Sequence, residues 1–323
     1  MDGGLLAWRE KRLLRKALRM LDPDCDGITL VDIGAAGAMP DRFAPVRDHL
    51  RYVGFEPDAR SREALLARPQ QCLSYEILPY AIGAAKGETA FHLCRKGEVS
   101  STFRPNRELL DRFPDPARFD VVETASLPVI TLDEAGIESC DFLKADIQGG
   151  ELDALQGGKH LLASCFGLEL EVEFQPLYQG QPLFCDISRF AAEQGFALVD
   201  FVDLTRWTRR SDPAHRRTAG AERFGQLVAG DALFLKLPEA FLAEQHGPAA
   251  LRRYLAVLLV YRRYDLILWL LANLPEKERL AQEPMANISR QLSRIIRNID
   301  RAQRLAKRLT LGTAAAYRYH MFY

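Results

Sequence analysis

Three acidic residues in this sequence stand where a carboxylate can bind a ligand or move a proton. Asp32 opens the stretch DIGAAG, in which Gly34 and Gly37 follow at the spacing of a glycine-rich ligand turn. Glu56 ends the run YVGFEP, and Asp146 ends DFLKAD. Each run is typical of a β-strand, and open α/β sheets bind ligands at the carboxyl ends of their strands. We therefore expect the three acids to surround one ligand site.

The turn at residues 32–37 differs from a dinucleotide-binding turn at one position. That turn carries glycine at the first position of G-x-G-x-x-G, where this chain has Asp32. A carboxylate repels a pyrophosphate but attracts the ammonium and sulfonium groups of S-adenosylmethionine. Gly34 and Gly37 let the backbone pass close to a ligand, and Ala35 keeps the turn narrow. The turn therefore predicts S-adenosylmethionine. A nicotinamide dinucleotide and a turn that only packs a helix on a strand remain as alternatives.

Glu56 lies about twenty residues beyond the glycines, where an acid commonly accepts hydrogen bonds from the two ribose hydroxyls. Both S-adenosylmethionine and a nicotinamide dinucleotide carry such a ribose. Glu56 therefore supports a nucleoside ligand without choosing between them.

A second group of acids lies on the segment LELEVEF. Glu169, Glu171 and Glu173 alternate, so that all three face one side of their strand. Those nearest its carboxyl end approach Asp146 if the two strands are neighbours. Methyl transfer to an alcohol requires loss of the alcohol proton, and a carboxylate can accept it. We predict Asp146 and Glu171 as the catalytic pair, while a solvated sheet face is an equal alternative for Glu169 and Glu173.

Other candidate residues have plainer interpretations. Paired carboxylates can bind a divalent cation, but no third ligand accompanies these acids, so no metal site is predicted. Glu151 lies in the first turn of the helix after the Gly149–Gly150 turn, and capping is its expected role. His92 lies between apolar neighbours and is expected to be structural.

Several motifs occur in the order found in one family. They are VDIGAAGAMP, GFEPD, SYEILPYAIGAAKGETAFHL, SST, ITLDE, DFLKADIQGGELDALQGG and LELEVEFQPLYQGQPLF. Together they resemble the FkbM-type methyltransferases over roughly residues 28–237. The resemblance implies a class I methyltransferase fold and S-adenosylmethionine as cofactor. It also implies an enzyme that methylates a hydroxyl of a sugar, a glycan or another natural product.

The resemblance also assigns residues by position. Those implied to line the methionine part of the cofactor are Asp32, Gly34, Ala35 and Gly37. Glu56 is implied to bind the ribose, and Tyr80, Ala81 and Ile82 to flank the adenine. Glu171 matches an acid that recurs in the family, and Tyr178 and Gln181 are implied acceptor contacts. Gln148 stands where many members have Glu, although Gln is also common there.

The elements expected to position these residues alternate along the chain. Strand-like runs between residues 29 and 237 alternate with helical segments at 59–67, 150–162 and 186–194. This order predicts an α/β fold: a Rossmann-like, mostly parallel sheet with helices on both faces. The last strands, at 196–204 and 227–237, are expected to form a hairpin. We predict an amphipathic helix within 1–27, a methyltransferase domain over 28–237 and a helical region over 238–323.

Charge and cysteine usage limit the partners and the location. The 43 Lys and Arg residues balance 43 Asp and Glu residues, which does not indicate nucleic-acid binding. Six scattered cysteines and the lack of a signal peptide predict a cytoplasmic protein.

The helical region from residue 238 onward is nevertheless basic, with a net charge of +7. Its arginines recur with helical spacing, at positions 290, 294, 297, 301, 304 and 308. The helix Arg290–Arg308 is therefore expected to carry one basic face, which suits a protein partner or an anionic membrane surface. A catalytically silent scaffold acting through this helix is the alternative to an enzyme with a small-molecule or carbohydrate acceptor. Oligomers are compatible with either.

Overall fold

The computed structural model describes residues 27–37, 39–68, 71–210, 225–244, 246–275 and 290–298, together with residues 301 and 304. The predicted helix within 1–27 lies outside the described residues, apart from Gly27. The described chain divides into two units. One contains residues 27–41 and 47–241, and the other contains residues 42–46 and the region from 242 onward.

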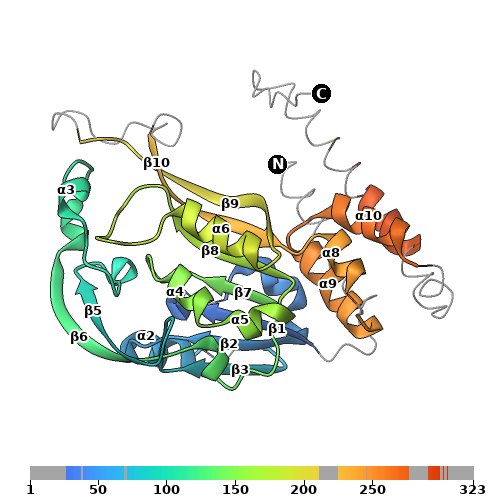
Figure 1. Cartoon of the computed structure of the whole chain (residues 1–323), viewed down its shortest axis with the longest axis horizontal. Coiled ribbons are helices and arrows are strands. Elements are labelled where there is room, and N and C mark those ends of the chain that lie inside the picture. The colour runs from blue at the N-terminus through green and yellow to red at the C-terminus, as the bar shows by residue number, and fades with distance from the viewer. Residues whose placement is uncertain are drawn as a thin grey trace. The chain divides into compact units, whose positions relative to one another are not determined.

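The larger unit is built on a seven-stranded sheet with the order β3-β2-β1-β7-β8-β10-β9 (Figure 1). Its strands are β1 (Ile28–Ile33), β2 (Leu50–Phe55), β3 (Ser74–Leu78), β7 (Phe142–Ala145), β8 (Gly167–Glu173), β9 (Ala197–Trp207) and β10 (Gln226–Leu235). The five neighbouring strands β3, β2, β1, β7 and β8 are parallel to one another, whereas β10 runs antiparallel to both β8 and β9. This arrangement confirms the predicted class I methyltransferase fold and the predicted terminal hairpin.

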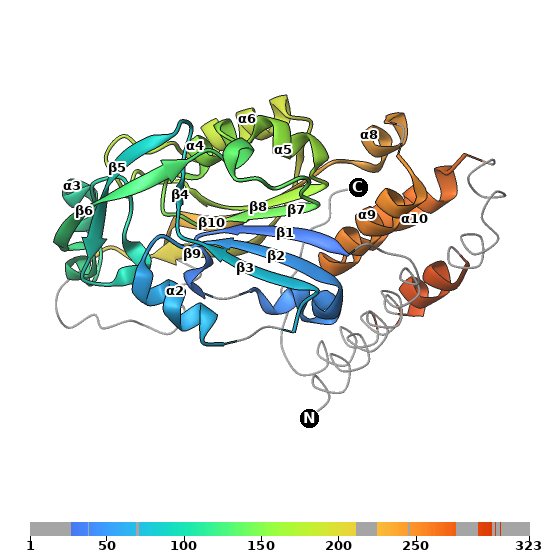
Figure 2. The ribbon, with the colours of Figure 1, turned by 90° about the horizontal axis from the view of Figure 1, so that it is seen from below.

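The central strands form because their apolar residues are buried on both faces. Four of the six residues of β1, including Val31 and Ile33, have no more than 1% of their surface exposed. Continuous apolar runs of this kind are typical of parallel strands covered by helices. Figure 2 shows helices α4 (Glu151–Gln156), α5 (Lys159–Ser164) and α6 (Phe184–Glu193) on one face, and α2 (Ala59–Leu66) on the other.

A second, three-stranded sheet has the order β4-β6-β5. It contains β4 (Ala81–Ile82), β5 (Gly87–Cys94) and β6 (Val121–Ile130). The sequence predicts strands in these places but not their separation from the main sheet. Between β5 and β6 the chain forms η3 (Gly97–Val99), α3 (Arg107–Leu110) and η4 (Pro116–Phe119). Isolated bridges join His92 to Ser101 and Pro105 to Tyr178, so this insertion reaches the segment that follows β8.

The helix predicted at 150–162 is two helices, because Gly157 and Gly158 interrupt it. A Cβ atom on Gly157 would lie 2.1 Å from the carbonyl oxygen of Gly83. At Gly158 it would lie 2.7 Å from a methyl carbon of Leu132, a residue of η5 (Leu132–Glu134). The glycine pair therefore leaves room for the backbone of Gly83 and the side chain of Leu132.

The second unit is helical, as predicted for the region after residue 238. It includes the end of α8 (Pro238–Ala243), α9 (Pro248–Val260), α10 (Tyr264–Asn273) and helical residues at 290–298, 301 and 304. The unit also takes in residues 42–46, part of η2 (Asp41–His49), because Phe43 packs against Tyr261 with ring centroids 6.0 Å apart. Among the described helices, none has the length and hydropathy to cross a membrane.

Candidate functional site

The glycine turn after β1 is fixed by the neighbouring strands β2 and β7. Gly34 has a φ of +85°, a conformation that favours glycine. A Cβ atom on Gly34 would lie 2.1 Å from the carbonyl oxygen of Asp146. The Gly34 N–H donates to the Phe55 carbonyl (3.0 Å), and the Asp146 N–H donates to the Ile33 carbonyl (3.0 Å). The turn continues into η1 (Ala35–Gly37). The ends of β1, β2 and β7 therefore meet at Gly34.

Asp32 lies under this turn with no exposed surface. Its Oδ2 accepts a hydrogen bond from the Tyr52 hydroxyl at 2.7 Å, and its Oδ1 accepts one from Lys144 Nζ at 3.4 Å. Burial raises the pKa of the Asp32 carboxyl, whereas Lys144 and Tyr52 oppose that shift. Both oxygens are thus bonded within the protein. Direct attraction of a cofactor by Asp32 stays a prediction. The ammonium of Lys144 already compensates the negative charge of Asp32 in the structure.

Lys144 is a site residue that the sequence analysis missed. It lies opposite Asp32 on β1 and opposite Glu169 on β8 in the parallel register. Its Nζ also lies 3.9 Å from Asp146 Oδ2. The neighbouring carboxylates Asp32, Asp146 and Glu169 raise its pKa against the effect of burial, so Lys144 stays charged. A lysine between Leu143 and Ala145 in a buried strand was the only signal in the sequence.

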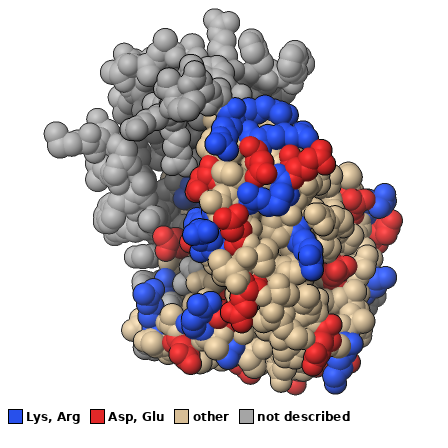
Figure 3. All heavy atoms as spheres, turned by 90° about the vertical axis from the view of Figure 1, so that its left-hand side faces the viewer, with Lys and Arg blue, Asp and Glu red and all other residues tan. Residues whose placement is uncertain are grey.

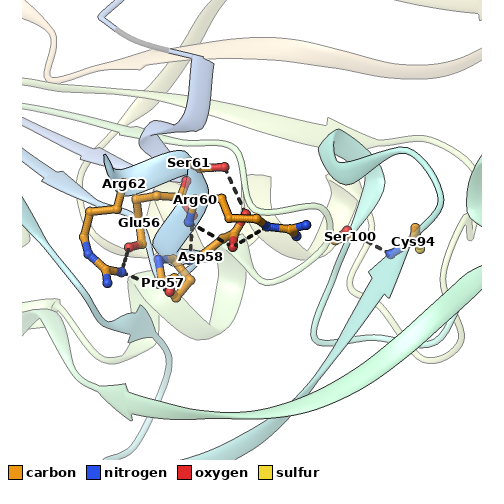
Figure 4. A network of polar contacts seen from close by, with 8 residues as sticks. All are labelled: Glu56, Pro57, Asp58, Arg60, Ser61, Arg62, Cys94 and Ser100. Atoms are coloured by element: carbon orange, nitrogen blue, oxygen red, sulfur yellow. Dashed lines mark hydrogen bonds and ion pairs between the residues drawn. The ribbon is translucent and has the colours of Figure 1, made fainter. Parts of the chain in front are cut away.

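Glu56 follows β2 and is 5% exposed. Its Oε1 accepts a hydrogen bond from the Asp58 N–H at 2.9 Å, and Arg62 Nη1 donates to the Glu56 carbonyl at 3.0 Å (Figure 4). Burial raises the pKa of the Glu56 carboxyl to about 7, and the N–H groups of Asp58 and Ala36 oppose the shift. Because Ala36 belongs to η1, Glu56 lies against the glycine turn, as its predicted role requires.

The three residues predicted to flank an adenine lie at the start of the second sheet. Tyr80 precedes β4 and is 36% exposed, whereas Ile82 is 7% exposed. Ala81 and Ile82 pair with β6 at Val129 and Ile130. The assignment of Tyr80, Ala81 and Ile82 to an adenine stays a prediction.

Asp146 and Glu171 lie side by side at the carboxyl ends of β7 and β8. The parallel register pairs Ala145 with Leu170, one residue before the two acids. Gln148 Nε2 donates to Asp146 Oδ1 at 3.3 Å and also donates to Glu171 Oε2. Burial raises the pKa of the Glu171 carboxyl well above its ordinary value, and the neighbouring Asp146 carboxylate raises it further. The structure thus brings the predicted catalytic pair together.

Gln148 has a strained backbone and forms hydrogen bonds with four residues. Its φ of +59° is uncommon for a residue with a side chain and marks stored strain. Ser101 Oγ donates to its carbonyl at 2.7 Å, and the Tyr178 hydroxyl donates to its Oε1 at 2.8 Å. The sequence predicted no role for Gln148. In the structure its amide bridges Asp146 and Glu171.

Glu151 has a structural role, but it bonds the loop before α4 and does not cap the helix as predicted. Its Oε1 accepts the Ile147 N–H at 2.7 Å, and its Oε2 accepts the Gly149 N–H at 2.9 Å. Burial raises the pKa of Glu151 to about 7. Its carboxylate therefore shapes the loop that presents Asp146 and Gln148.

Two other expectations concern residues around the pair. His92 is buried, and its Nδ1 lies 3.1 Å from Thr124 Oγ1, as expected for a structural histidine. Tyr178 is fully buried, and its hydroxyl has two acceptors within reach of its single proton, the Val99 carbonyl oxygen (2.9 Å) and Gln148 Oε1 (2.8 Å). Tyr178 thus positions Gln148 and does not present its hydroxyl to solvent. Within the described residues, no group of three or more His, Cys, Asp or Glu is arranged to hold a metal ion.

The outer face formed by the insertion between β5 and β6 carries charges of both signs, unlike the site, where acids predominate. Figure 3 shows basic and acidic side chains interspersed on the face where α3 and β6 lie. Ion pairs between residues of α3 and its surroundings explain part of this mixture: Arg107–Asp111 at 2.7 Å, Arg107–Asp120 at 3.1 Å and Arg112–Glu108 at 3.1 Å. This visible face therefore offers no extended area of one charge to select an acceptor.

The sheet order, the glycine turn and the acids at the carboxyl edge define a class I methyltransferase. The sequence pattern of the FkbM methyltransferase domain matches residues 32–198, just over half of the chain. The chain belongs to the FkbM methyltransferase family, and S-adenosylmethionine is the cofactor that this membership implies.

Similar proteins include 2-O-methyltransferase NoeI of Sinorhizobium fredii, which is 30% identical over 162 residues. The match covers 47% of this chain and 66% of NoeI, a little under two thirds of that relative. Solved structures show more distant similarity. The FkbM methyltransferase of Methylobacillus flagellatus is 14% identical over 65% of this chain and 44% of its own, with a TM-score of 0.37. Magnesium protoporphyrin IX methyltransferase of Synechocystis, with bound SAM, is 11% identical over 71% and 80%, with a TM-score of 0.32.

Proposed function

We propose that this chain is an S-adenosylmethionine-dependent O-methyltransferase that acts on a hydroxyl of a carbohydrate or another natural product. The observation that carries the proposal is the carboxyl pair Asp146–Glu171, bridged by Gln148. The pair lies at the strand ends beside the glycine turn, where such sheets bind ligands. The name of the relative NoeI, a 2-O-methyltransferase, supports an oxygen acceptor.

The residues around the turn fit the implied cofactor. S-adenosylmethionine, when bound, supplies a methyl group on a cationic sulfur. The site has more acids than bases, because Lys144 compensates only part of the charge of Asp32, Asp146 and Glu169. A cationic ligand is favoured beside such a surplus. Glu56 accepts one hydrogen bond from Asp58, and its carboxylate has capacity for the ribose hydroxyls.

In this proposal the carboxyl pair removes the acceptor proton. A neighbouring negative charge disfavours ionisation of a carboxyl, so Asp146 increases the affinity of Glu171 for a proton. Burial and the Asp146 charge raise the pKa of Glu171 in the direction that a general base requires. Gln148 fixes the orientation of both carboxyls. The proton of the acceptor hydroxyl would pass to one of these two carboxyls. The bound cofactor would supply the methyl group, whose bond to sulfur breaks as its bond to the acceptor oxygen forms, and would leave as S-adenosylhomocysteine.

The test separates methyl transfer from cofactor binding. We expect Asp146→Asn with Glu171→Gln to retain S-adenosylmethionine binding by calorimetry, while methyl transfer slows by about 10²-fold or more. Transfer of labelled methyl to a panel of methyl glycosides gives the rate. Glu193→Gln, at an exposed position of α6, is the matched control. Full activity in the double variant would show that the pair is not the base. Lack of both cofactor binding and transfer in the wild-type protein would favour the scaffold instead.

A further inference from the structure

The two carboxyls at the ends of β7 and β8 differ in the charges around them. Lys144 Nζ lies 3.9 Å from Asp146 Oδ2. Within the part of the chain that the structure describes, Lys144 is the one base that forms an ion pair with Asp146, and Glu171 forms none. Gln148 donates to both carboxyls and therefore does not distinguish them. The cation of Lys144 does.

Lys144 is held beside Asp146 by its neighbour on β1. Asp32 lies opposite Lys144 in the parallel register, and Lys144 Nζ donates to Asp32 Oδ1 at 3.4 Å. The Tyr52 hydroxyl donates to the other oxygen, Oδ2, at 2.7 Å, which fixes the orientation of the Asp32 carboxyl. On the opposite side Glu169 of β8 faces Lys144 in register. A chain of contacts thus runs from β2 through β1 to the ammonium beside Asp146.

The other charged groups that act on Glu171 are acids. Burial raises the pKa of the Glu171 carboxyl well above its ordinary value. The charges of Asp146, Glu173 and Glu151 raise this pKa further. A carboxyl with such an affinity for protons holds one before an acceptor binds. The ammonium of Lys144 has the opposite effect on its own neighbour, because a nearby cation favours the ionised form of a carboxyl.

Asp146 is also within reach of a ligand. Its side chain is 42% exposed, so an acceptor hydroxyl can approach the carboxylate. The Lys144 side chain is only 17% exposed, and its ammonium is bonded to Asp32. Lys144 therefore contacts the carboxylate from within the protein and acts on the reaction through Asp146.

We infer that Lys144 is a positioning residue that keeps Asp146 ionised, and that Asp146 rather than Glu171 takes the proton of the acceptor hydroxyl. Glu171 keeps its own proton throughout, and the transferred proton ends on Asp146. This inference rests on the proposed function and divides the roles that the proposed function leaves shared between the two carboxyls.

The first experiment compares the two single amide variants by transfer of labelled methyl to methyl glycosides. Asp146→Asn removes the charge that accepts the proton, so we expect transfer to slow by about 10²-fold or more. Glu171→Gln replaces a protonated carboxyl by a neutral amide of the same shape, so transfer should slow by less than about tenfold. An equal loss in the two variants, or a larger loss in Glu171→Gln, would overturn the division of roles.

The second experiment tests Lys144 through the pH dependence of kcat. Transfer requires ionised Asp146, so the rate rises with pH along an acid limb. Lys144→Met keeps much of the side chain but removes the charge that favours ionisation. We expect the acid limb to move to higher pH by about one unit or more, whereas Lys144→Arg should keep it at the wild-type pH. An acid limb at the wild-type pH in Lys144→Met would exclude the role of Lys144.

Loss of stability needs its own control, because Lys144→Met also removes the cation that Asp32 bonds. Asp141 lies at the opposite end of β7 and accepts the Thr29 N–H at 2.8 Å. Asp141→Ala should lower the melting temperature without moving the acid limb. If Lys144→Met does not fold, Lys144→Gln replaces it, since its amide keeps a hydrogen-bond donor for Asp32 but no charge. The same shift of the acid limb is expected.

Two further results separate this inference from the proposed function. Full transfer in the double variant Asp146→Asn with Glu171→Gln would remove the base from the proposed function. Transfer that is lost in the double variant but kept in both single variants would leave the proposed function standing and overturn the division of roles.

A readout without an acceptor covers the case in which no glycoside of the panel is methylated. Carbon NMR of protein labelled at the glutamate carboxyls identifies Glu171 by the resonance missing from Glu171→Gln. We expect this carboxyl to be protonated at about pH 7. An ionised Glu171 at that pH would overturn the inference.

Discussion

The two ends of the carboxyl edge of the main sheet treat buried acids in opposite ways. At the β1–β2 end, Asp32 is bonded by Tyr52 and Lys144, and Glu56 is bonded by the Asp58 N–H. At the β8 end, the Glu173 carboxyl is equally buried but has no hydrogen-bond partner among the described residues.

This difference teaches what each end is built for. An acid with its partners in place is positioned by the fold before any ligand arrives, which is how preorganised sites work. A buried acid without partners costs stability, and such a cost persists in proteins where function uses the group. The fold therefore holds the acids of the β1–β2 end in place by itself, whereas it leaves the Glu173 carboxyl at the β8 end without that support.

The largest change in stability that tests this difference between the two ends is expected at Asp32. Asp32→Ala removes the acceptor of the Tyr52 hydroxyl and the carboxylate that Lys144 bonds at 3.4 Å, closer than Asp146 at 3.9 Å. Removing one member of a buried ion pair typically costs about 3–5 kcal/mol. We expect a loss of that size in the free energy of unfolding, measured with urea, and weaker binding of S-adenosylmethionine. Asp203→Ala, exposed on β9, is the control. Unchanged stability in Asp32→Ala would mean that the two ends do not differ.

A smaller effect is expected at Glu56, on the pH dependence of stability and of cofactor binding. Its folded-state pKa of about 7 exceeds the ordinary value of 4.5, so its contribution to stability is present below 4.5 and is lost as the pH rises to about 7. Ribose hydroxyls donate to the ionised carboxylate, so the affinity for S-adenosylmethionine should rise with pH through about 7.

Calorimetry from about pH 5.5 to about pH 8.5 tests this dependence. Glu56→Gln should bind S-adenosylmethionine at least about tenfold more weakly at the alkaline end, about 1.4 kcal/mol, with a flatter pH profile. Glu151 has a similar pKa, but it accepts hydrogen bonds from the backbone and is present in both proteins. A pH dependence that the wild-type protein shows and Glu56→Gln lacks is therefore due to Glu56. A wild-type profile with no change near pH 7 would remove Glu56 from the ribose site.

The smallest effect concerns charges outside both ends of the sheet. The described arginines of the basic helix (290, 294, 297, 301 and 304) are exposed, whereas Leu292, Ile295 and Ile296 are buried. Reversing Arg294, Arg297 and Arg301 to Glu should change the free energy of unfolding by less than about 1 kcal/mol per ion pair lost. Cofactor binding and methyl transfer should not change.

The same triple variant tests a role for the basic helix. We expect it to bind vesicles of phosphatidylcholine and phosphatidylserine more weakly than the wild-type protein at low salt. Equal vesicle binding by the two proteins would show that the arginines are only a solvated face.

The sequence predicted the strands of the main sheet well because their apolar runs are long and bounded by glycine, proline and acids. It also predicted that Asp146 and Glu171 meet, on the condition that β7 and β8 are neighbours. Consecutive strands joined by a helical crossover usually are neighbours, and here they pair in parallel. Residue pattern and topology together were sufficient for this part of the site.

Other features were not predictable from local pattern. Apolar periodicity marks β5 and β6 as strands but does not say which partner they choose, and their separate sheet was missed. The pairing of Lys144 with Asp32 joins residues 112 positions apart, through a register that only the assembled sheet defines. The bridging role of Gln148 depends on its left-handed backbone, which no residue type at that position announced.

The contact between Gly34 and Asp146 also limits how this chain can change over generations. Any side chain at position 34 would overlap the backbone of Asp146, since a Cβ there would lie 2.1 Å from the Asp146 carbonyl oxygen. The hydrogen bonds from Gly34 to Phe55 and from Asp146 to Ile33 prevent either segment from yielding alone. Position 34 is therefore closed to single substitutions. A lineage that altered it would have to rebuild the turn after β1 and the loop that begins at Asp146 in the same step.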